Sequence, residues 1–414
     1  MIVEQLELVD FRNYTNASFD LTSGVTAIVG RNAQGKTNVA EAMAFLATLD
    51  SFRQVPPVAL VREGAEFATI RAVVRHNDGR ELQVEVQIQR QGRTIVQVNK
   101  QRLPRTRDLL GVLRVTVFSP DDLELVKGSP SERRRFVDET LVSLALRNDA
   151  LRLELDRVLK QRNTLLRQSN GRLTEEIGFT LDVWDEKLAA VGNEIGHERA
   201  TVLAQLQPLV QQAYQHLAGY PMAVTLQYEP AWRRTGLGMA LANARQDDIR
   251  RGVSTVGPHR DDIDLYLASL PARTHASQGE MRCLALSLRL AAHQLVAEKT
   301  DMTPLLVLDD VLSELDPDRC TALLTHLPKG QVVITTASDT PPASDRSKPP
   351  CCTTASSGWT TRLRGPPRSA RRNPPAHRRR APCAGGLYRS ARLRAGVCRL
   401  FTNRVAHHGP YFRR

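Results

Sequence analysis

A phosphate-binding loop near the start of the chain is the feature that most constrains its fold. Residues 30–37 read GRNAQGKT and fit the pattern G-x-x-x-x-G-K-[ST]. The apolar run 25–29 comes directly before the loop, and a stretch with helical spacing of apolar residues follows it. A buried strand that leads through such a loop into a helix N-terminus is typical of nucleotide-binding α/β proteins. The sequence therefore predicts a nucleotide site at the end of a strand.

Each residue type in the loop has a physical role. Gly30 and Gly35 let the backbone curl so that successive N–H groups point at phosphate oxygens, and the dipole of the following helix adds to the attraction. Lys36 is expected to reach the β and γ phosphates, and the Thr37 hydroxyl is expected to bind Mg²⁺. We expect the whole segment to contact ATP, that is Gly30, Arg31, Asn32, Ala33, Gln34, Gly35, Lys36, Thr37 and Asn38.

A second apolar strand, far along the chain, ends in two carboxylates. Residues 305–308 are Leu-Leu-Val-Leu, and Asp309 and Asp310 follow them. Ligands of α/β sheets bind at the carboxyl ends of the strands, so both side chains should lie beside the phosphate loop. Asp309 is expected to hold Mg²⁺ together with Thr37, and Asp310 to orient or deprotonate the attacking water. Lys36, Asp309 and Asp310 are therefore the candidate catalytic residues.

The tetrapeptide SQGE at 277–280 precedes the acidic strand by some thirty residues. Ser277 and Gly279 at a helix N-terminus would offer hydroxyl and N–H donors to an anion. Taken alone, the tetrapeptide is equally well explained by an ordinary serine N-cap. Its position between the phosphate loop and the acidic strand makes it a candidate third part of the nucleotide site.

Strand signals occur in two parts of the chain, and a charged helical stretch separates them. The first part has apolar or alternating runs at 2–9, 25–29, 68–75, 82–89, 93–98 and 115–118; the second has runs at 223–228, 263–268, 304–308 and 331–335, with a helix at 279–297. This pattern predicts an α/β fold with mixed sheets. We expect a first lobe at 1–130, a helical segment at 131–220, a second lobe at 221–339 and a tail at 340–414.

The helical segment has the spacing of an antiparallel pair. Apolar residues at 177, 181, 184, 188, 191, 195 and 202 follow the 4-3 spacing of a coiled-coil seam. An earlier apolar series runs from Leu144 to Leu166, and Asn170-Gly171 supplies a turn between the two series. We expect two long antiparallel helices that form either a projecting coiled-coil arm or a compact lid, because three heptads do not separate these alternatives.

The basic charge of the chain belongs to its tail. The net charge is +13, but residues 340–414 carry 16 Arg and one Lys against one acid, so the first 339 residues sum to −3. Any DNA-binding argument for the folded body must therefore rest on local patches. The tail is rich in Pro, Arg, Ala and Cys and lacks any helical or strand period. It fits either a disordered basic tail or a reading-frame error near residue 338 in a GC-rich gene, and we favour the frame error.

Targeting signals are not evident. The chain has no run of about 18 apolar residues, and its first residues include acids and no apolar core of a signal peptide. We therefore expect a cytoplasmic protein with no membrane partner.

Taken in order, these motifs resemble the ABC-type ATPases of the structural-maintenance-of-chromosomes (SMC) group, and within it the RecF family. The resemblance is carried by FRNY at 11–14, the phosphate loop with Asn38, Glu41 and Ala42, FSPDDL at 118–123, VKG at 126–128, RRRF at 133–136, GPHRDD at 257–262, SQGE at 277–280 and LDDVLSELD at 308–316. These motifs span about residues 1–337, and GPHRDD is specific to this family. The tail does not match, since a short closing strand would be expected there.

The resemblance implies an ABC-type ATPase head with a helical arm or lid, in which two protomers sandwich ATP and Mg²⁺. The phosphate loop of one protomer would face Ser277 and Gly279 of the other, with Asp316 at the seam. It further implies a protein of the DNA-damage response and replication restart that dimerises on ATP at gaps or single-strand/duplex junctions. Cooperation with RecR and RecO, and support of RecA loading, are part of the same implication.

Two departures from the wider ABC group predict slow ATP hydrolysis. Thr335-Thr336 stands where a switch histidine often lies, and Asp310 is one methylene shorter than the usual Glu. Both changes should weaken the activation of water. Two other functions stay open, namely a chromosome-organising ATPase with a short arm and a non-hydrolysing clamp in which nucleotide only sets the oligomer.

The candidate contacts outside the nucleotide site are less specific. The arginines at 133–135, Arg53 and Arg62 are candidates for DNA phosphate contacts, although a solvated helix face explains such a run as well. His259 and Arg260 could contact nucleotide, DNA or a partner subunit, or could belong to a structural turn.

Overall fold

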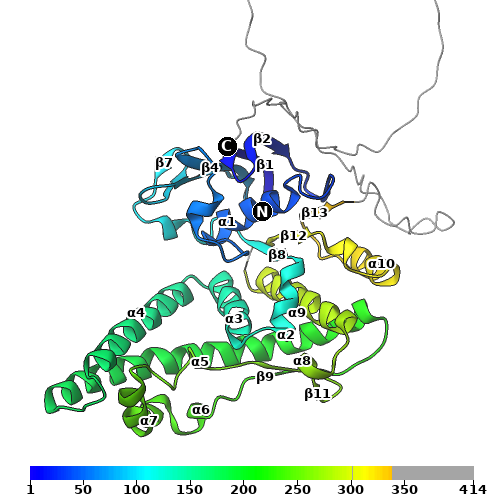
Figure 1. The fold of residues 1–414 in the computed structure, drawn as a ribbon. Coiled ribbons are helices and arrows are strands. Elements are labelled where there is room, and N and C mark those ends of the chain that lie inside the picture. Colours follow the sequence, from blue (N-terminus) through cyan, green and yellow to red (C-terminus); the bar gives the residue numbers. More distant parts are fainter. Residues whose placement is uncertain (301, 338–414) are drawn as a thin grey trace, which may run out of the picture.

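The computed structural model describes residues 1–300 and 302–337, so the tail expected at 340–414 lies outside the described residues. Most strands gather at one end of the molecule and the long helices at the other, where β9 and β11 also lie (Figure 1). The strands are β1 (Ile2–Phe11), β2 (Tyr14–Asp20), β3 (Val25–Val29), β4 (Phe67–Arg75), β5 (Glu81–Gln89), β6 (Ile95–Val98), β7 (Gln101–Arg102), β8 (Val115–Phe118), β9 (Val224–Gln227), β10 (Asp264–Leu267), β11 (Leu270–Pro271), β12 (Leu305–Asp309) and β13 (Val332–Thr336).

With the exception of α1, the α-helices follow the strands of the six-stranded sheet along the chain. They are α1 (Lys36–Thr48), α2 (Glu124–Lys127), α3 (Pro130–Leu144), α4 (Arg147–Gln168), α5 (Glu175–Ala218), α6 (Trp232–Thr235), α7 (Leu237–Arg251), α8 (Ala272–His275), α9 (Gln278–Lys299) and α10 (Pro317–Thr325). Short 3-10 helices lie at Pro57–Leu60 (η1), Thr106–Leu109 (η2), Pro120–Leu123 (η3) and Val311–Ser313 (η4).

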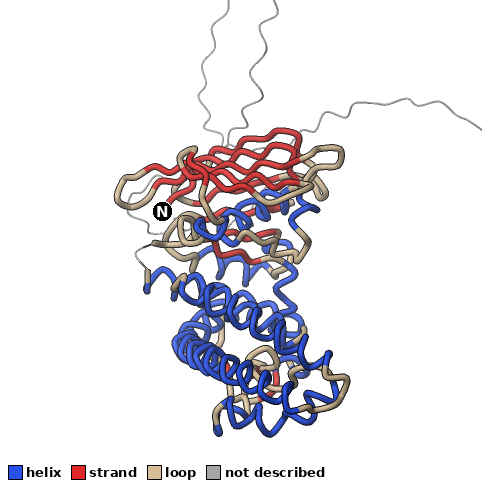
Figure 2. The backbone as a smooth tube through the Cα atoms, turned by 90° about the vertical axis from the view of Figure 1, so that its left-hand side faces the viewer, coloured by secondary structure: helices blue, strands red, loops and turns tan. Residues whose placement is uncertain are grey.

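Three sheets build the layers. A six-stranded antiparallel sheet has the order β2-β1-β4-β5-β6-β7, a four-stranded parallel sheet has the order β3-β13-β12-β8, and β11-β10-β9 form a small third sheet. Figure 2 shows the two larger sheets stacked above the helical part of the molecule. This arrangement confirms the predicted α/β fold with mixed sheets.

Strand β12 is buried on both faces, and this places the core. Leu305 and Val307 pack into the apolar cluster that α1 shares with the six-stranded sheet. Leu306 and Leu308 pack into a second cluster with α3, α5 and α9. Because side chains alternate across a strand, a continuous apolar run is the pattern expected when both faces are covered. The parallel sheet is therefore the middle layer of the head.

Helix α5 belongs to both the head and the helical part. Its 44 residues correspond to roughly 66 Å of helix. The half after Val202 packs into the core beside α9, while the half before Ile195 packs against α4 and α7. The turn expected at 170–171 is present, with positive φ at Asn170 and Gly171.

The two long helices expected on either side of this turn are present as α4 and α5, and a separate helix, α3, precedes them. Helix α3 ends at Leu144, Ala145 is extended, and α4 begins at Arg147. Asn148 stabilises the break by donating from Nδ2 to Leu141 O (2.8 Å), one of the last carbonyls of α3. Helix α7 was not anticipated at all.

Buried charge holds the outer helices together. The Arg162 guanidinium on α4 is fully buried and donates to Asp185 of α5 (2.6 Å) and to Asp248 of α7 (2.7 Å). It also donates to Ser254 Oγ (2.8 Å) in the segment after α7. One arginine thus joins three helices.

Within the described residues, no helix is long and apolar enough to cross a membrane.

Candidate nucleotide-binding site

The register of the parallel sheet brings the two distant motifs to one edge. Strand β13 lies between β3 and β12, with Thr336 opposite Val29 and Thr335 opposite Asp309. The phosphate loop begins at the next residue after β3, where Gly30 N donates to Thr336 O (3.3 Å). The carboxyl ends of β3 and β12 therefore lie at the same edge of the sheet, on either side of β13, as predicted from the sequence.

The phosphate loop is curled, and its neighbours fix the curl. Gly35 has φ +100°, and a Cβ there would lie 2.6 Å from Asn13 Oδ1. Asn13 Nδ2 donates to Gln34 O (3.2 Å), and Tyr14 OH donates to Gly35 O (3.2 Å). The turn between β1 and β2 thus packs directly against the loop. Ala33 also has a positive φ of 65°.

The ammonium group of Lys36 lies within the loop. Its Nζ donates to Gly30 O (2.8 Å) and Arg31 O (3.1 Å), and the residue is only 6% exposed. Arg31 N donates to the side-chain Oε1 of Gln34 (2.9 Å), which ties the two ends of the exposed part of the loop. A cation inside a curl of backbone groups is suited to a phosphate.

Asp309 is a buried carboxylate with two hydroxyl partners. Thr335 Oγ1 donates to its Oδ1 (2.5 Å), and Thr37 also hydrogen-bonds to it. Burial raises the pKa of Asp309, and these two hydrogen bonds oppose the rise. The expected metal ligands Thr37 and Asp309 are therefore adjacent. Their hydroxyl and carboxylate oxygens are the hard donors that Mg²⁺ prefers, so the residues present fit that ion.

Asp310 follows in a strained backbone conformation. Its φ is +52°, which is uncommon for a residue other than glycine. Its N–H donates to both the carbonyl (3.1 Å) and the hydroxyl (3.0 Å) of Thr335, and its Oδ1 accepts from Ser313 Oγ (2.7 Å). The side chain is partly exposed at the sheet edge. Three groups thus determine where this carboxylate points.

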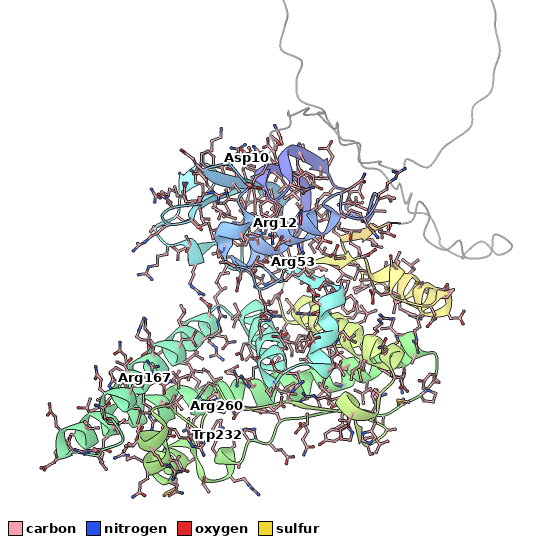
Figure 3. The ribbon with its side chains drawn as sticks, in the orientation of Figure 1. Asp10, Arg12, Arg53, Arg167, Trp232 and Arg260 are labelled. Atoms are coloured by element: carbon pink, nitrogen blue, oxygen red, sulfur yellow. The ribbon has the colours of Figure 1, made fainter. Side chains whose placement is uncertain are left out.

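A buried ion pair supports the loop from behind. Glu41 on α1 is fully buried and accepts from Arg12 Nε (2.8 Å) and Nη2 (2.7 Å). Ser51 Oγ donates to the same carboxylate (2.5 Å), and Arg53 lies 4.0 Å from it. Figure 3 places Arg12 and Arg53 close together beside α1. The one sequence signal for this cluster was a glutamate on the otherwise apolar face of α1.

Ser277 and Gly279 lie apart from the loop, at the N-terminus of α9. Ser277 is the N-cap, and it exchanges hydrogen bonds with Glu280 through a capping box (2.8 and 3.3 Å). A Cβ at Gly279 would collide with Nη1 of Arg319 on α10. The contacts that the described residues give to this turn are thus with its own helix and α10.

The GPHRDD element joins the helices to the head. Asp261 is buried and accepts from Tyr228 OH (2.6 Å) and Trp232 Nε1 (2.7 Å), while Arg199 of α5 donates to Pro258 O (2.7 Å). His259 Nε2 donates to a backbone carbonyl (3.1 Å), and burial lowers its pKa to about 4. Figure 3 shows Arg260 and Trp232 in the helical part, far from Arg12. The structural reading of this turn is the one that the contacts favour.

Most of the arginines expected to contact DNA are engaged within the protein. Arg133 is 6% exposed and forms a two-pronged ion pair with Asp262 (2.7 and 2.9 Å), so the expectation for this residue was wrong. Arg134 donates to a backbone carbonyl (2.5 Å), and Arg135 pairs with a glutamate one helical turn away. Arg62 pairs with an aspartate of β1 (2.6 Å).

Comparison with known proteins identifies the family. The model of the RecF/RecN/SMC N-terminal domain matches residues 2–344. The DNA replication and repair protein RecF of Streptomyces avermitilis is 44% identical over 353 residues, which cover 82% of this chain and 94% of that protein. The chain belongs to the RecF family. The RecF protein of Frankia alni is 42% identical with 93% of its length covered, so the predicted resemblance to RecF is confirmed.

Solved structures agree with the RecF assignment. The recombination mediator protein RecF bound to ATP, described as part of the RecFOR pathway, has a TM-score of 0.76 at 30% identity. That match covers 81% of this chain and 92% of the solved one. An Smc head bound to the C-terminal winged-helix domain of ScpA has a TM-score of 0.50 at 17% identity and shares the fold alone. The predicted ABC-type head is confirmed.

Proposed function

We propose that this RecF family member binds ATP with Mg²⁺ and uses it to control DNA binding in recombinational repair and replication restart. The observation that carries the proposal is the meeting of the phosphate loop with Asp309 and Asp310 at one edge of the parallel sheet. The relatives are named as DNA replication and repair proteins, and one was solved with ATP. Both facts support this assignment.

The residues at the sheet edge divide the chemistry among them. Lys36 and the loop N–H groups hold the phosphates, and Thr37 and Asp309 hold the cation. Mg²⁺ bound there would neutralise charge on the phosphate oxygens. Asp310 orients water for attack on the γ phosphate. We expect slow turnover for two reasons. The side chain of Asp310 is one methylene shorter than that of the usual Glu. Thr335 stands where a histidine often lies, and its hydroxyl is already hydrogen-bonded to Asp309 and to the N–H of Asp310.

The site is completed by a second protomer. Ser277 is exposed at the N-terminus of a 22-residue helix, whose N–H groups and dipole favour an anion. Gly279 beside it lies against Arg319 of α10, and within the described residues no hydrogen bond or ion pair joins Ser277 to the phosphate loop of its own chain. ATP therefore joins the loop of one copy to Ser277 and Gly279 of another, with Asp316 at the seam. The dimer forms on gapped DNA or single-strand/duplex junctions, cooperates with RecR and RecO, and supports RecA loading.

Asp310→Asn tests the proposal against its alternatives, with Asp318→Asn as a matched control at an exposed acid of α10. ATP turnover and ATP-dependent dimer formation are measured on the same samples, with and without gapped duplex. We expect Asp310→Asn to abolish turnover and to retain the ATP-dependent dimer, and the control to behave as wild type. A wild-type protein that dimerises on ATP without turnover would instead indicate a non-hydrolysing clamp.

A chromosome-organising ATPase with a short arm predicts a different DNA preference. Such a protein would bind long intact duplex as well as a gapped one. Competition between gapped and intact duplexes of equal length therefore separates the two functions. Equal affinity for both DNAs would argue against the repair assignment.

A further inference from the structure

The outer end of the six-stranded sheet carries an unusual concentration of positive charge. Between residues 90 and 108 the chain has six basic residues and one acid, which gives +5, while the rest of the first 339 residues sums to −8. The basic residues are Arg90, Arg93, Lys100, Arg102, Arg105 and Arg107. All six are exposed. They occupy the segment from the end of β5 through β6 and β7 to η2, at the edge marked by β7 in Figure 1.

In the described part of the chain, five of these six cations form no ion pair with a carboxylate, and one of the five, Arg90, donates to two backbone carbonyls instead. Within residues 1–300 and 302–337, no ion pair joins Arg93, Lys100, Arg102 or Arg105 to an acid, whereas Arg107 pairs with Asp149 of α4. The single acid of the segment, Asp108, accepts a hydrogen bond from a backbone N–H at the start of η2 (3.2 Å). We name Arg93, Lys100, Arg102 and Arg105 the basic edge. Its charge is not neutralised locally.

The backbone of the hairpin projects these side chains outward. Asn99 and Lys100 form a two-residue turn with positive φ at both positions (50° and 65°), so Lys100 lies at the hairpin tip. Arg102 is paired with Gln97, and side chains of paired residues lie on the same face. The neighbouring Val96 is buried in the core, so Gln97 and Arg102 lie on the opposite, solvent face.

The sheet surface beside the basic edge is neutral. On the solvent face of β5, Gln83, Gln87 and Gln89 alternate with buried Val84, Val86 and Ile88. The two acids on this face, Glu81 and Glu85, are paired with Arg75 and Arg71. A polyanion that reaches the basic edge therefore meets amide groups, which hydrogen-bond to phosphate and sugar oxygens, and no unpaired carboxylate on this row.

An exposed edge strand often carries lysine or arginine only to prevent pairing with another sheet. That role requires one or two charges at the strand itself. Here the charges extend beyond β7 to Arg93 and Arg105, outside any strand. They are also of one sign, on a body that is otherwise acidic. Edge protection accounts for Arg102 and leaves the other three unexplained.

We infer that the basic edge is a contact surface for the phosphate backbone of DNA. The inference rests on the proposed function and assigns its DNA contact to the first lobe. Unpaired exposed cations release counterions from DNA when they neutralise phosphates, and this term dominates sequence-independent affinity. The arginines at 133–135 are engaged internally, so this edge supplies the cations that they do not.

The test compares two variants of equal charge change. The edge variant is Arg93→Gln, Lys100→Gln, Arg102→Gln and Arg105→Gln. The control removes one Lys and three Arg that are exposed and lack ion pairs in the described part of the chain, through Lys160→Gln, Arg172→Gln, Arg234→Gln and Arg251→Gln. Binding of each protein with ATP to a fluorescein-labelled gapped duplex is measured between about 50 and 200 mM salt. ATP affinity and oligomeric state are recorded alongside.

We expect the edge variant to lower the slope of log K against log salt by about 3 to 4, since each phosphate contact contributes about 0.9. The control should change the slope by less than one, and both should bind ATP as wild type does. Equal losses in the two variants, or an edge variant that aggregates with an unchanged slope, would overturn the inference. A wild-type protein that binds ATP but no DNA would instead contradict the proposed function.

Discussion

Replacement of Thr335 by valine removes one hydroxyl from the centre of the candidate site. Thr335 Oγ1 donates to Asp309 Oδ1 (2.5 Å) and accepts from Asp310 N (3.0 Å), and the residue is fully buried in β13. Valine has nearly the same shape, so the strand and its neighbours keep their places. The change therefore isolates the hydrogen bonds of one buried group.

The two lost bonds differ in weight. The bond to the carboxylate is charge-assisted, and such bonds contribute about 1.5–3 kcal/mol. The N–H of Asp310 keeps the carbonyl of residue 335 as an acceptor (3.1 Å), so its loss is smaller. We expect the free energy of unfolding to fall by about 2 kcal/mol. Because Thr335 opposes the effect of burial, the pKa of Asp309 should rise further in the variant.

Thr335→Ser is the matched control, because it keeps the hydroxyl and loses only a methyl group worth about 1 kcal/mol. Stability alone therefore separates the variants poorly, and the pH dependence of Mg²⁺-ATP affinity is the decisive measurement. A cation competes with a proton for Asp309. As pH falls, affinity should be lost at a higher pH in the valine variant than in the serine variant. Identical pH profiles would refute the role given to this hydroxyl.

Three further results are expected. Arg162→Met should lower the free energy of unfolding, measured in urea, by about 3–5 kcal/mol, because it leaves two buried carboxylates without their ion-pair partner. Arg157→Met, at an exposed ion pair, should lower it by less than about 1 kcal/mol. Equal losses of stability in the two variants would contradict this account. Burial lowers the pKa of His293 to about 4. As pH falls below about 6.5, the unfolded state binds a proton at this residue that the folded state does not, so the free energy of unfolding should fall by roughly 2 kcal/mol by pH 5. A His293→Leu variant that keeps the full pH dependence of stability would refute this origin. Gly35→Ala should abolish ATP binding, since its Cβ would meet a side chain at 2.6 Å at φ +100°, while Gly24→Ala has nothing within 4 Å and should bind ATP normally.

Local patterns were enough to predict the strands that position the site. Strands β3 and β8 begin and end at the predicted residues, because short apolar runs bounded by turn residues have few alternatives. The sequence also predicted that the phosphate loop and Asp309 lie at the same edge of a sheet, since such motifs occupy the carboxyl ends of strands. The predictions failed for elements and side chains whose positions depend on residues far away in the sequence. Helix α7 shows a weak apolar stripe, because only Leu237, Leu241 and Ile249 of its apolar residues are buried.

Charge was harder to interpret than hydrophobicity. The arginines at 133–135 and those of the basic edge look alike as sequence, yet Arg133 is buried against Asp262, 129 residues away. Arg162 is fully buried with carboxylates from two other helices. No local pattern distinguishes an arginine that meets a distant aspartate from one that stays in solvent. The tertiary fold alone assigns these roles.

The same buried charges connect the nucleotide lobes to the outer helices. Helix α5 carries Asp185 in the Arg162 cluster and Arg199 in the GPHRDD junction, then continues into the core beside α9. Ser277, the N-cap of helix α9, is the residue proposed to meet ATP on a second protomer. Because α5 is fixed by ion pairs at one end and packed against α9 at the other, we expect it to transmit a displacement of that turn to the outer helices. Because Arg199 pairs with Asp138 (2.8 Å), Asp138→Asn should weaken this connection while leaving ATP affinity of the isolated protomer unchanged. ATP-dependent dimerisation that is insensitive to this change would show that the outer helices are not coupled to the nucleotide site.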